Sequence, residues 1–392
     1  MLSIFETLGW LSRIQVFMTI FDYELSEKIS RTKYILGFIR RIPIIVMCGY
    51  AALDVITIFY GELSFGSNDS RTSEAVSVID LVVIKVSSLC ITFYFIFKQK
   101  RHLKLIKEEM NFERKWADLL GSEVWRRRSI DRWKYNLRAI LIFLYNFSYN
   151  YVLYLSLEEE QTKNLASTFW YIVLICQSAN VDYVAFYISG YFNVFSMSLD
   201  AINLDKLPLY RKLNLLIFLT EYLEIVRKLN AVFVYGLLIV LVTRLVEAST
   251  TFYFLFVFTY DLPIDYIAYI AFFALCCGLW TIGNIFVMLQ ITMVGDYFKE
   301  KMNSTISKIT ASHEEGKSRK TTKDIVNLNT KIFLLKILHE SEEIRIGQIF
   351  HINRYLLFKK TLTLLCSNLV IFVQFRQFEL GSSLDFIENM EG

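Results

Sequence analysis

The sequence predicts an all-α polytopic membrane protein with seven transmembrane helices. Hydrophobic residues make up 54% of the 392 residues, and they gather in long blocks with most charged residues between them. Lipid offers no hydrogen-bond partner to an open strand edge, so helices are the structure expected for such blocks. The basic residues also fall almost entirely on alternate connections between the blocks.

Each predicted helix comes from one of these blocks. A helix needs about 20 residues to cross about 30 Å of hydrocarbon. Seven blocks reach or approach that length, and in chain order they are residues 42–60, 76–98, 137–157, 166–189, 229–258, 264–294 and 355–375.

The basic residues predict how the chain is oriented. One set of connections, which includes the N-terminal segment and residues 190–228, holds 35 lysines and arginines, whereas the other set holds 3. The positive-inside rule therefore places the N-terminus in the cytoplasm and the C-terminus outside the cell. The sequence Asn68-Asp69-Ser70 then lies in the first outer loop, where Asn68 is a candidate for glycosylation.

Sequence motifs give no support to an enzyme. The chain has no Walker-type glycine-rich loop, no HExxH and no G-x-S-x-G. Its four histidines are scattered, so neither a metal site nor a cofactor is expected. The expected partner is membrane lipid, and no nucleic acid is expected to bind. A cytoplasmic N-terminus argues against a G-protein-coupled receptor, and the absence of paired interrupted helices argues against an inverted-repeat transporter.

The last block carries a specific motif. Residues 367–375 read SNLVIFVQF, and residues 350–358 before them read FHINRYLLF. The first stretch resembles the last-helix signature of the insect gustatory receptor family, which is Thr-Tyr, five hydrophobic residues and Gln-Phe. Ser367 replaces the threonine conservatively, and Asn368 departs from the tyrosine. The order and size of the spans are similar to that family over nearly the whole chain.

This resemblance implies a plasma-membrane, multi-pass receptor of sensory neurons, assembled as a homotetramer or heterotetramer. The last helix of each subunit would line a central cation pore, and small organic ligands would bind in the outer half of each subunit. Residues 1–294 would then form the first six spans with the ligand pocket. Residues 295–354 would form a cytoplasmic loop and anchor helix, residues 355–375 the pore helix, and residues 376–392 an extracellular tail.

The anchor helix has support in the residue pattern. Apolar residues recur at three- and four-residue spacing from Ile325 through Leu328, Ile332, Leu335 and Leu338, which gives one apolar helix face. This apolar face could pack against another subunit or against other helices of the same subunit.

Helical spacing selects the candidate pore residues. Positions 367, 371, 374 and 378 share one helix face, with position 375 at its edge. Apolar rings on such a face could close a pore by dewetting, and glutamine amides could offer oxygens to hydrated cations. The alternative role for the glutamine is to cap the helix end or to bond a neighbouring helix. The predicted pore and gate residues are Ser367, Ile371, Gln374, Phe375 and Phe378.

Two further groups of residues are candidates for ligand binding or for a structural polar cluster. Charged side chains inside a membrane are costly, which makes Asp80, Lys85, Arg244 and Glu247 notable; Arg244 and Glu247 are three residues apart and can pair. Aromatic walls with a few polar groups suit a small organic ligand. The predicted ligand-binding residues are Tyr151, Tyr154, Trp170, Tyr171, Glu247, Thr250, Tyr253, Tyr266, Tyr269 and Trp280.

The function expected from these observations is a gustatory-receptor-like, ligand-gated, non-selective cation channel that detects a small organic tastant. The alternative is a divergent relative that keeps the fold without channel activity and serves as a scaffold or partner subunit. Ser367 and Asn368 are the residues that keep this alternative open.

Overall fold

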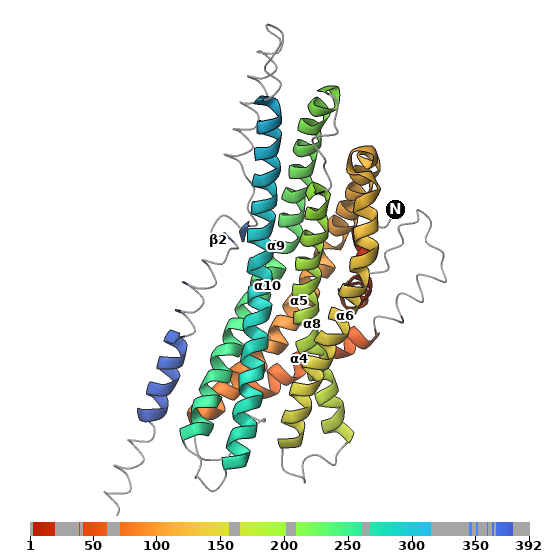
Figure 1. Cartoon of the computed structure of the whole chain (residues 1–392). Helices are drawn as coiled ribbons and strands as arrows, with labels where there is room; N and C mark the ends of the chain where they lie inside the picture. Colours follow the sequence, from red (N-terminus) through yellow and green to blue (C-terminus); the bar gives the residue numbers. More distant parts are fainter. Residues whose placement is uncertain are drawn as a thin grey trace, which may run out of the picture.

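The computed structural model shows a bundle of long helices (Figure 1). It describes residues 3–19, 39, 42–60, 71–156, 165–200, 209–260, 267–314, 345–346, 350–351, 359, 363 and 366–378. Asn68, the predicted anchor face from Ile325 to Leu338 and the predicted tail beyond residue 378 lie outside these residues.

The described helices follow the predicted order of spans. They are α1 (Ile4–Thr7), α2 (Trp10–Thr19), α4 (Ile42–Phe59), α5 (Arg71–Lys115), α6 (Ala117–Ser156), α8 (Leu165–Asp200), α9 (Leu209–Tyr260) and α10 (Ile267–Glu314). Residues 366–378 form a further helix, called the terminal helix below. The predicted all-α, multi-span fold class is confirmed.

Four of the described helices are long and apolar enough to cross a membrane; these candidate spans cover Thr72–Lys115, Thr168–Asp200, Ile217–Val257 and Ala274–Lys308. The apolar part of α4, Ile42–Thr57, is shorter. The helices run well beyond the hydrophobic blocks, because α5 continues to Lys115 and α10 to Glu314. The bundle therefore extends past the apolar layer at the end where α5 joins α6 (Figure 1).

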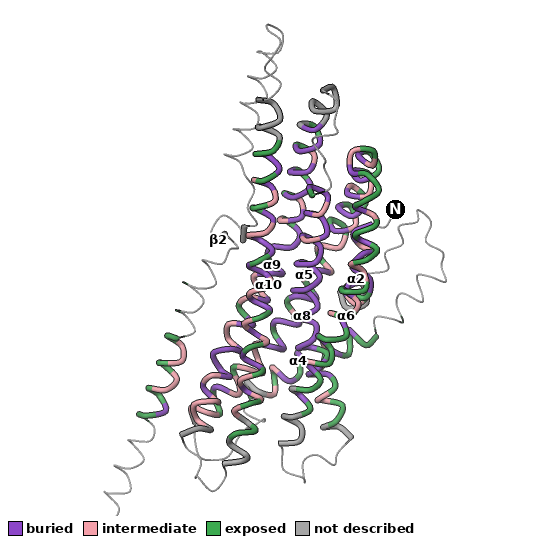
Figure 2. The backbone as a smooth tube through the Cα atoms, viewed as in Figure 1, coloured by how far each residue is buried: buried purple, intermediate pink, exposed green. Residues whose placement is uncertain are grey.

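The centre of the bundle is α8. Its apolar stretch is 89% buried, and it is buried along most of its length (Figure 2). α6, α9 and α10 pack against it, and α5 packs against α9. Beyond the apolar blocks, Phe195 stacks on Tyr222 with ring centroids 4.4 Å apart, and Tyr222 stacks on Phe298. These aromatic contacts hold the extended ends of α8, α9 and α10 together.

The N-terminal helices pack into the bundle. A capping box between Ser3 and Glu6 starts α1, which packs against α6 and α8, and Ile4 of α1 and the C-cap residue Leu8 are fully buried. Gly9 has a φ of 54°, and a Cβ there would lie 2.2 Å from Asn136 Oδ1. Glycine is therefore required at this turn both by the backbone and by the close approach of α6.

Two very short strands are the only described exception to the helical fold. β1 (Arg345–Ile346) pairs antiparallel with β2 (Phe350–His351), so that Arg345 faces His351. They lie within the segment predicted as a cytoplasmic loop with an anchor helix, where no strand was predicted. Two residues a strand do not change the fold class.

Candidate functional site

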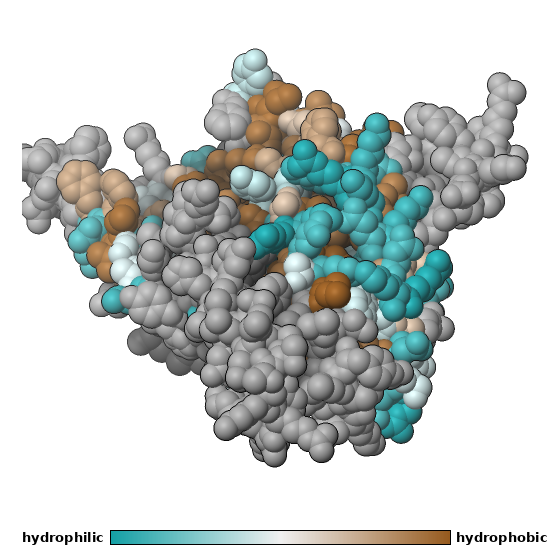
Figure 3. Space-filling model, turned by 90° about the horizontal axis from the view of Figure 1, so that it is seen from above, coloured by the Kyte–Doolittle hydropathy of each residue, from teal (hydrophilic) through white to brown (hydrophobic). Residues whose placement is uncertain are grey.

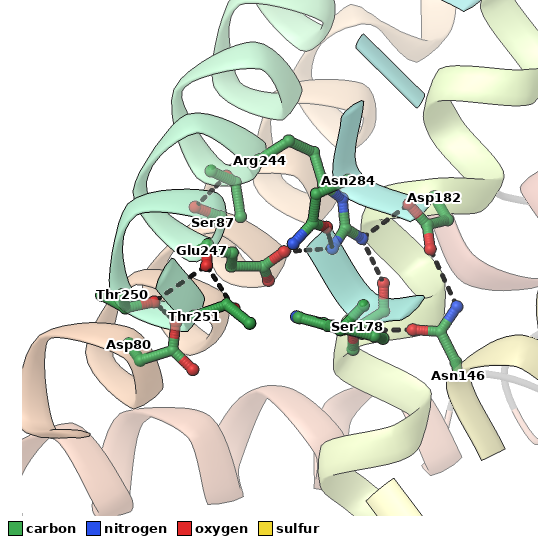
Figure 4. A network of polar contacts seen from close by, with 12 residues as sticks. Asp80, Ser87, Asn146, Ser178, Asp182, Arg244, Glu247, Thr250, Thr251 and Asn284 are labelled. Atoms are coloured by element: carbon green, nitrogen blue, oxygen red, sulfur yellow. Dashed lines mark hydrogen bonds and ion pairs between the residues drawn. The ribbon is translucent and has the colours of Figure 1, made fainter. Parts of the chain in front are cut away.

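A buried cluster of charged side chains surrounds Arg244 in the middle of α9 (Figure 4). Arg244 has no exposed surface, although its guanidinium carries a charge at all relevant pH values. Its Nη2 lies 2.6 Å from Asp182 Oδ1 of α8, and its Nη1 donates to Glu247, one turn further along α9. The pairing of Arg244 with Glu247 that their spacing predicts is confirmed.

The same guanidinium reaches two more helix positions. Nη1 donates to Asn284 Oδ1 of α10 at 3.1 Å, and Nη2 donates to the carbonyl oxygen of Ser178 at 3.3 Å. One arginine therefore joins α8, α9 and α10. The planar guanidinium suits this role because its five N–H groups point in fixed directions.

Further hydrogen bonds extend the cluster to α6. Asn146 Nδ2 of α6 donates to Asp182 Oδ2 at 2.8 Å, and Ser178 Oγ donates to Asn146 Oδ1 at 2.7 Å. Asn146 itself is fully buried. It therefore fixes the second carboxylate oxygen of Asp182, whose first oxygen faces Arg244.

The cluster also includes α5. Thr250 Oγ1 of α9 donates to Asp80 Oδ1 at 2.6 Å, and Thr243 Oγ1 donates to Ser87 Oγ at 2.6 Å. Thr250, the partner of Asp80, lies one turn from Glu247 on α9, and its Oγ1 also contacts the carbonyl oxygen of Glu247 at 3.0 Å. Five helices meet in one polar network, called the Arg244 cluster below.

An aromatic pair borders the Arg244 cluster. The rings of Tyr145 and Trp280 are stacked with centroids 5.0 Å apart and planes 8° apart, and the guanidinium carbon of Arg244 lies 5.9 Å from the Trp280 ring centre. Tyr145 Oη donates to the carbonyl oxygen of Trp280 at 3.0 Å. This arrangement places a flat apolar surface beside a charged group, which is typical of sites that bind small organic molecules.

Four buried polar atoms of the cluster have no hydrogen-bond partner among the described residues, and they are Asp182 Oδ1, Arg244 Nε, Glu247 Oε1 and Asn284 Nδ2. Asp182 Oδ1 is ion-paired with Arg244 Nη2. Glu247 Oε1 is an acceptor and Asn284 Nδ2 is a donor. Glu247 Oε2 and Asn284 Oδ1, the remaining polar atoms of these two side chains, both accept from Nη1 of Arg244. In addition, the cluster holds three carboxyl groups and one guanidinium. Buried groups of this kind are usually satisfied, which makes Glu247 Oε1 and Asn284 Nδ2 candidates for contact with a bound molecule.

A second ion pair lies between α4, α5 and α8. Lys85 donates to Asp54 Oδ2, which also accepts from Trp170 Nε1 at 2.9 Å. The Lys85 ammonium lies 4.8 Å from the Trp170 ring centre, and Tyr171 packs edge-on against that ring. Lys85, Trp170 and Tyr171 are therefore brought together, but in a group of their own.

One row of α9 leads from the Arg244 cluster to the terminal helix. Arg244, Glu247, Thr250 and Tyr253 follow one another at three-residue spacing, so each lies beside the next, and the row winds about halfway around α9 from Arg244 to Tyr253. Tyr253 is fully buried, and its ring centroid lies 5.7 Å from that of Phe372 in an edge-to-face contact. Its hydroxyl shares a 3.0 Å hydrogen bond with Ser73 Oγ of α5.

The terminal helix has one packed side and one open side. Arg376 is buried and Phe372 is half-buried toward the bundle. The face on the opposite side of the helix is exposed in this chain, and its residues are Ser367, Ile371, Gln374, Phe375 and Phe378. These are the residues that the sequence assigned to a pore.

Tyr151, another predicted ligand-binding residue, lies apart from the cluster. Tyr151 is on the outer surface of α6, where its ring stacks on Phe147. The side chains of Tyr154, Tyr266 and Tyr269 lie outside the described part of the structure. In contrast, Glu247, Thr250, Tyr253 and Trp280 are all buried in or beside the cluster.

Sequence reasoning missed seven members of these polar groups, and they are Asp54, Ser87, Asn146, Ser178, Asp182, Thr243 and Asn284. Asp54 and Asp182 each carry a charge inside an apolar block, which is the same signal that singled out Arg244. The two asparagines have no comparable signal, because a lone amide is common in polar helix contacts.

Comparisons with known proteins agree with this architecture. A search of curated proteins found no match. Two solved structures of the insect olfactory receptor OR5 from Machilis hrabei, one in complex with eugenol, have the same fold with a TM-score of 0.56 each. Identity is 10% for the eugenol complex and 11% for the other, and each comparison covers 95% of this chain and 99% of the receptor. The sequence model of the 7tm chemosensory receptor family matches residues 10–379, so the chain belongs to that family.

Proposed function

We propose that this protein is a ligand-gated, non-selective cation channel of the gustatory type, which acts in the plasma membrane of a sensory neuron. Four subunits, identical or related, surround a pore lined by their terminal helices. A small organic tastant binds within each subunit and opens the pore.

The exposed face of the terminal helix carries this proposal. Ser367 and Gln374 are polar, yet they lie on the side of the helix that faces away from the bundle. A polar side chain directed at lipid is costly, whereas the same side chain beside a water-filled path is not. Ile371 lies between them and supplies an apolar ring that can close the path by dewetting.

Gating requires a link between the ligand and this helix. The row from Arg244 to Tyr253 on α9 offers one, because its last member touches Phe372 of the terminal helix. A ligand that binds one arrangement of the Arg244 cluster better than another shifts the population of the two arrangements. The shift then reaches the terminal helix through the ring of Tyr253.

The cluster favours a ligand with a polar end and an apolar body. Glu247 Oε1 can accept a hydrogen bond and Asn284 Nδ2 can donate one, and a hydroxyl group of a ligand can do both in return. The stacked rings of Tyr145 and Trp280 offer the apolar surface. Eugenol, which is bound to the olfactory receptor OR5 in one of the solved structures, is a compound of this general class.

The test is to express the chain in a heterologous cell, alone and with related receptor subunits, and to record current while applying sugars, bitter compounds and other small organic molecules. Ligand-evoked cation current is the expected result. If the chain reaches the cell surface and no compound evokes current, alone or with partners, the scaffold or partner-subunit function replaces the proposal.

The pore assignment has its own test. Gln374→Ala is expected to change relative ion permeability or baseline current, because it removes four amides from the path. Gln377→Ala is the matched control, since Gln377 is an exposed glutamine of the same helix outside the set of proposed pore residues. Equal permeability and baseline current in wild type and Gln374→Ala would remove Gln374 from the pore.

A further inference from the structure

An apolar stripe on the outer face of α6 matches the thickness of a bilayer. Leu137, Ile140, Leu141 and Leu144 are exposed at helical spacing, and none packs into the bundle. Trp133, 58% exposed, and Tyr151, 47% exposed, lie at the two ends of the stripe. The rise from Trp133 to Tyr151 is about 27 Å on an α-helix, close to the hydrocarbon thickness of about 30 Å.

Trp133 therefore marks one boundary between hydrocarbon and headgroups, where tryptophan is enriched. Beyond it on α6 lie Arg126 and Arg127, at about 9 to 10 Å along the helix axis. Lys134 follows Trp133 directly. The side chains of all three basic residues are more than half exposed.

The surface continues from α6 onto α2. The backbone N–H of Trp10 donates to Asn136 Oδ1 at 2.8 Å, which places the start of α2 beside α6 one turn from Trp133. Trp10 is 46% exposed, and Arg13, three residues later on the same side of α2, is also exposed. Two helices distant in sequence thus present a tryptophan and basic residues at one level.

We propose that these side chains form a binding surface for anionic phospholipid headgroups of the leaflet that they face. The members of this headgroup surface are Trp10, Arg13, Arg126, Arg127, Trp133 and Lys134. The tryptophans lie at the interface, and the basic side chains reach lipid phosphates and carboxylates.

Charge supports an anionic partner over a zwitterionic one. Glu123 pairs with Arg126 and Arg127, and Asp131 pairs with Lys134, so the surface keeps a net positive charge. Hydrogen bonding from Arg127, and the charges of both arginines, lower the pKa of Glu123. Hydrophilic side chains also gather over the region where α5 joins α6 when the bundle is seen from that end (Figure 3). Each basic residue near an anionic membrane contributes about fivefold in binding.

The first experiment compares the purified full chain in nanodiscs of phosphatidylcholine with nanodiscs that also contain phosphatidylserine. Phosphatidylserine is expected to raise the midpoint of thermal unfolding of the wild type. The variant R126Q/R127Q/K134Q is expected to lose this shift and to keep the wild-type midpoint in phosphatidylcholine alone. R126K/R127K, which retains the charges, is expected to keep the shift.

The matched control is K104Q/K107Q/R114Q, which removes three exposed basic side chains from α5. If the control loses the lipid shift as fully as the α6 variant does, general attraction of a basic protein end to the leaflet explains the effect and the proposed surface is wrong. Absence of any shift in the wild type also overturns it.

A second measurement does not depend on the stability of the charge variants. Brominated phosphatidylserine is expected to quench tryptophan fluorescence more strongly than brominated phosphatidylcholine at the same bromine content. Trp133→Phe and Trp10→Phe are each expected to reduce the difference. Equal quenching by the two lipids in the wild type would show no preference for the anionic headgroup and would reject the proposal.

Discussion

Among the residues that the structure describes, two arginines, Arg244 and Arg128, are fully buried, and their surroundings differ. Arg244 meets Asp182 and Glu247 within the apolar blocks of α8 and α9. Arg128 meets Glu113, with Nη2 2.5 Å from Oε1, where α5 and α6 extend beyond the blocks. Arg128 also donates to Ser198 Oγ of α8 at 3.3 Å.

The difference lies in what each arginine is connected to. From Arg244, one row of α9 reaches Tyr253 and then Phe372 of the terminal helix. From Arg128, the contacts lead to Glu113 and Ser198, which join the extended ends of α5, α6 and α8. Both arginines are thus in buried ion pairs with carboxylates. Under the proposed function the pairs of Arg244 serve gating, whereas the pair of Arg128 holds the extended ends of the helices together. Four substitutions test this contrast, in order of decreasing expected effect.

Replacement of Arg244 should have the largest effect. Arg244→Met leaves Asp182 and Glu247 buried without their cation, a loss that costs about 3–5 kcal/mol when one partner of a buried pair is removed. A large fall in the thermal unfolding midpoint in detergent and the loss of ligand-evoked current are expected. The variant R244M/D182N/E247Q should recover stability without recovering current. If Arg244→Met gives the same ligand-evoked current as the wild type, the Arg244 cluster has no role in gating.

Replacement of Arg128 should destabilise the protein while leaving gating intact. Arg128→Met is expected to cost about 3 kcal/mol, at the lower end of the range for a broken buried pair, because its site lies past the apolar blocks. The double variant R128M/E113Q should regain part of the lost stability, because no unpaired carboxylate is left buried. Channels that reach the surface should keep the wild-type ligand concentration for half-maximal current. If that concentration shifts as much as it does in a variant of the Arg244 cluster, the two arginines do not differ in their effect on gating and the proposed contrast is wrong.

Truncation of Phe372 should affect gating more than stability. Phe372→Ala removes one edge-to-face contact, worth about 0.5–1.5 kcal/mol, between the terminal helix and Tyr253. We expect a changed ratio of ligand-evoked to baseline current at nearly unchanged unfolding midpoint. Val373→Ala, at the next position of the terminal helix, is the control. If both variants respond alike, the ring contact has no special role in coupling.

Loss of the Ser73 hydroxyl should have the smallest effect. Ser73→Ala removes the partner of the Tyr253 hydroxyl, a hydrogen bond worth about 1 kcal/mol. The expected result is a small shift of the ligand dose-response curve, in the same direction as that of Phe372→Ala. Tyr253→Phe should give the same shift, and no further change should appear when both substitutions are combined. Additive shifts would mean that the two hydroxyls act separately.

The positions of the helices were predictable because lipid and water sort residues by simple rules. The first block, 42–60, became α4 (Ile42–Phe59), and the fourth, 166–189, starts one residue after α8 begins. The far ends were predicted less well. The second span was predicted to end at residue 98, but helix α5 continues to Lys115, because Phe112 and the following Trp116 pack against Phe218 of α9. Such packing leaves no mark in hydropathy.

The sequence by itself determined the class of the protein, the order of its spans and the presence of costly charges inside them. Hydrophobic blocks and helical spacing are local properties, and each can be read from one segment. Only the tertiary structure decided that Lys85 pairs with Asp54 while Arg244 joins α8, α9 and α10 through Asp182, Glu247 and Asn284. The choice of partner depends on which helix faces meet across the bundle, and that is settled by packing among segments far apart in the chain.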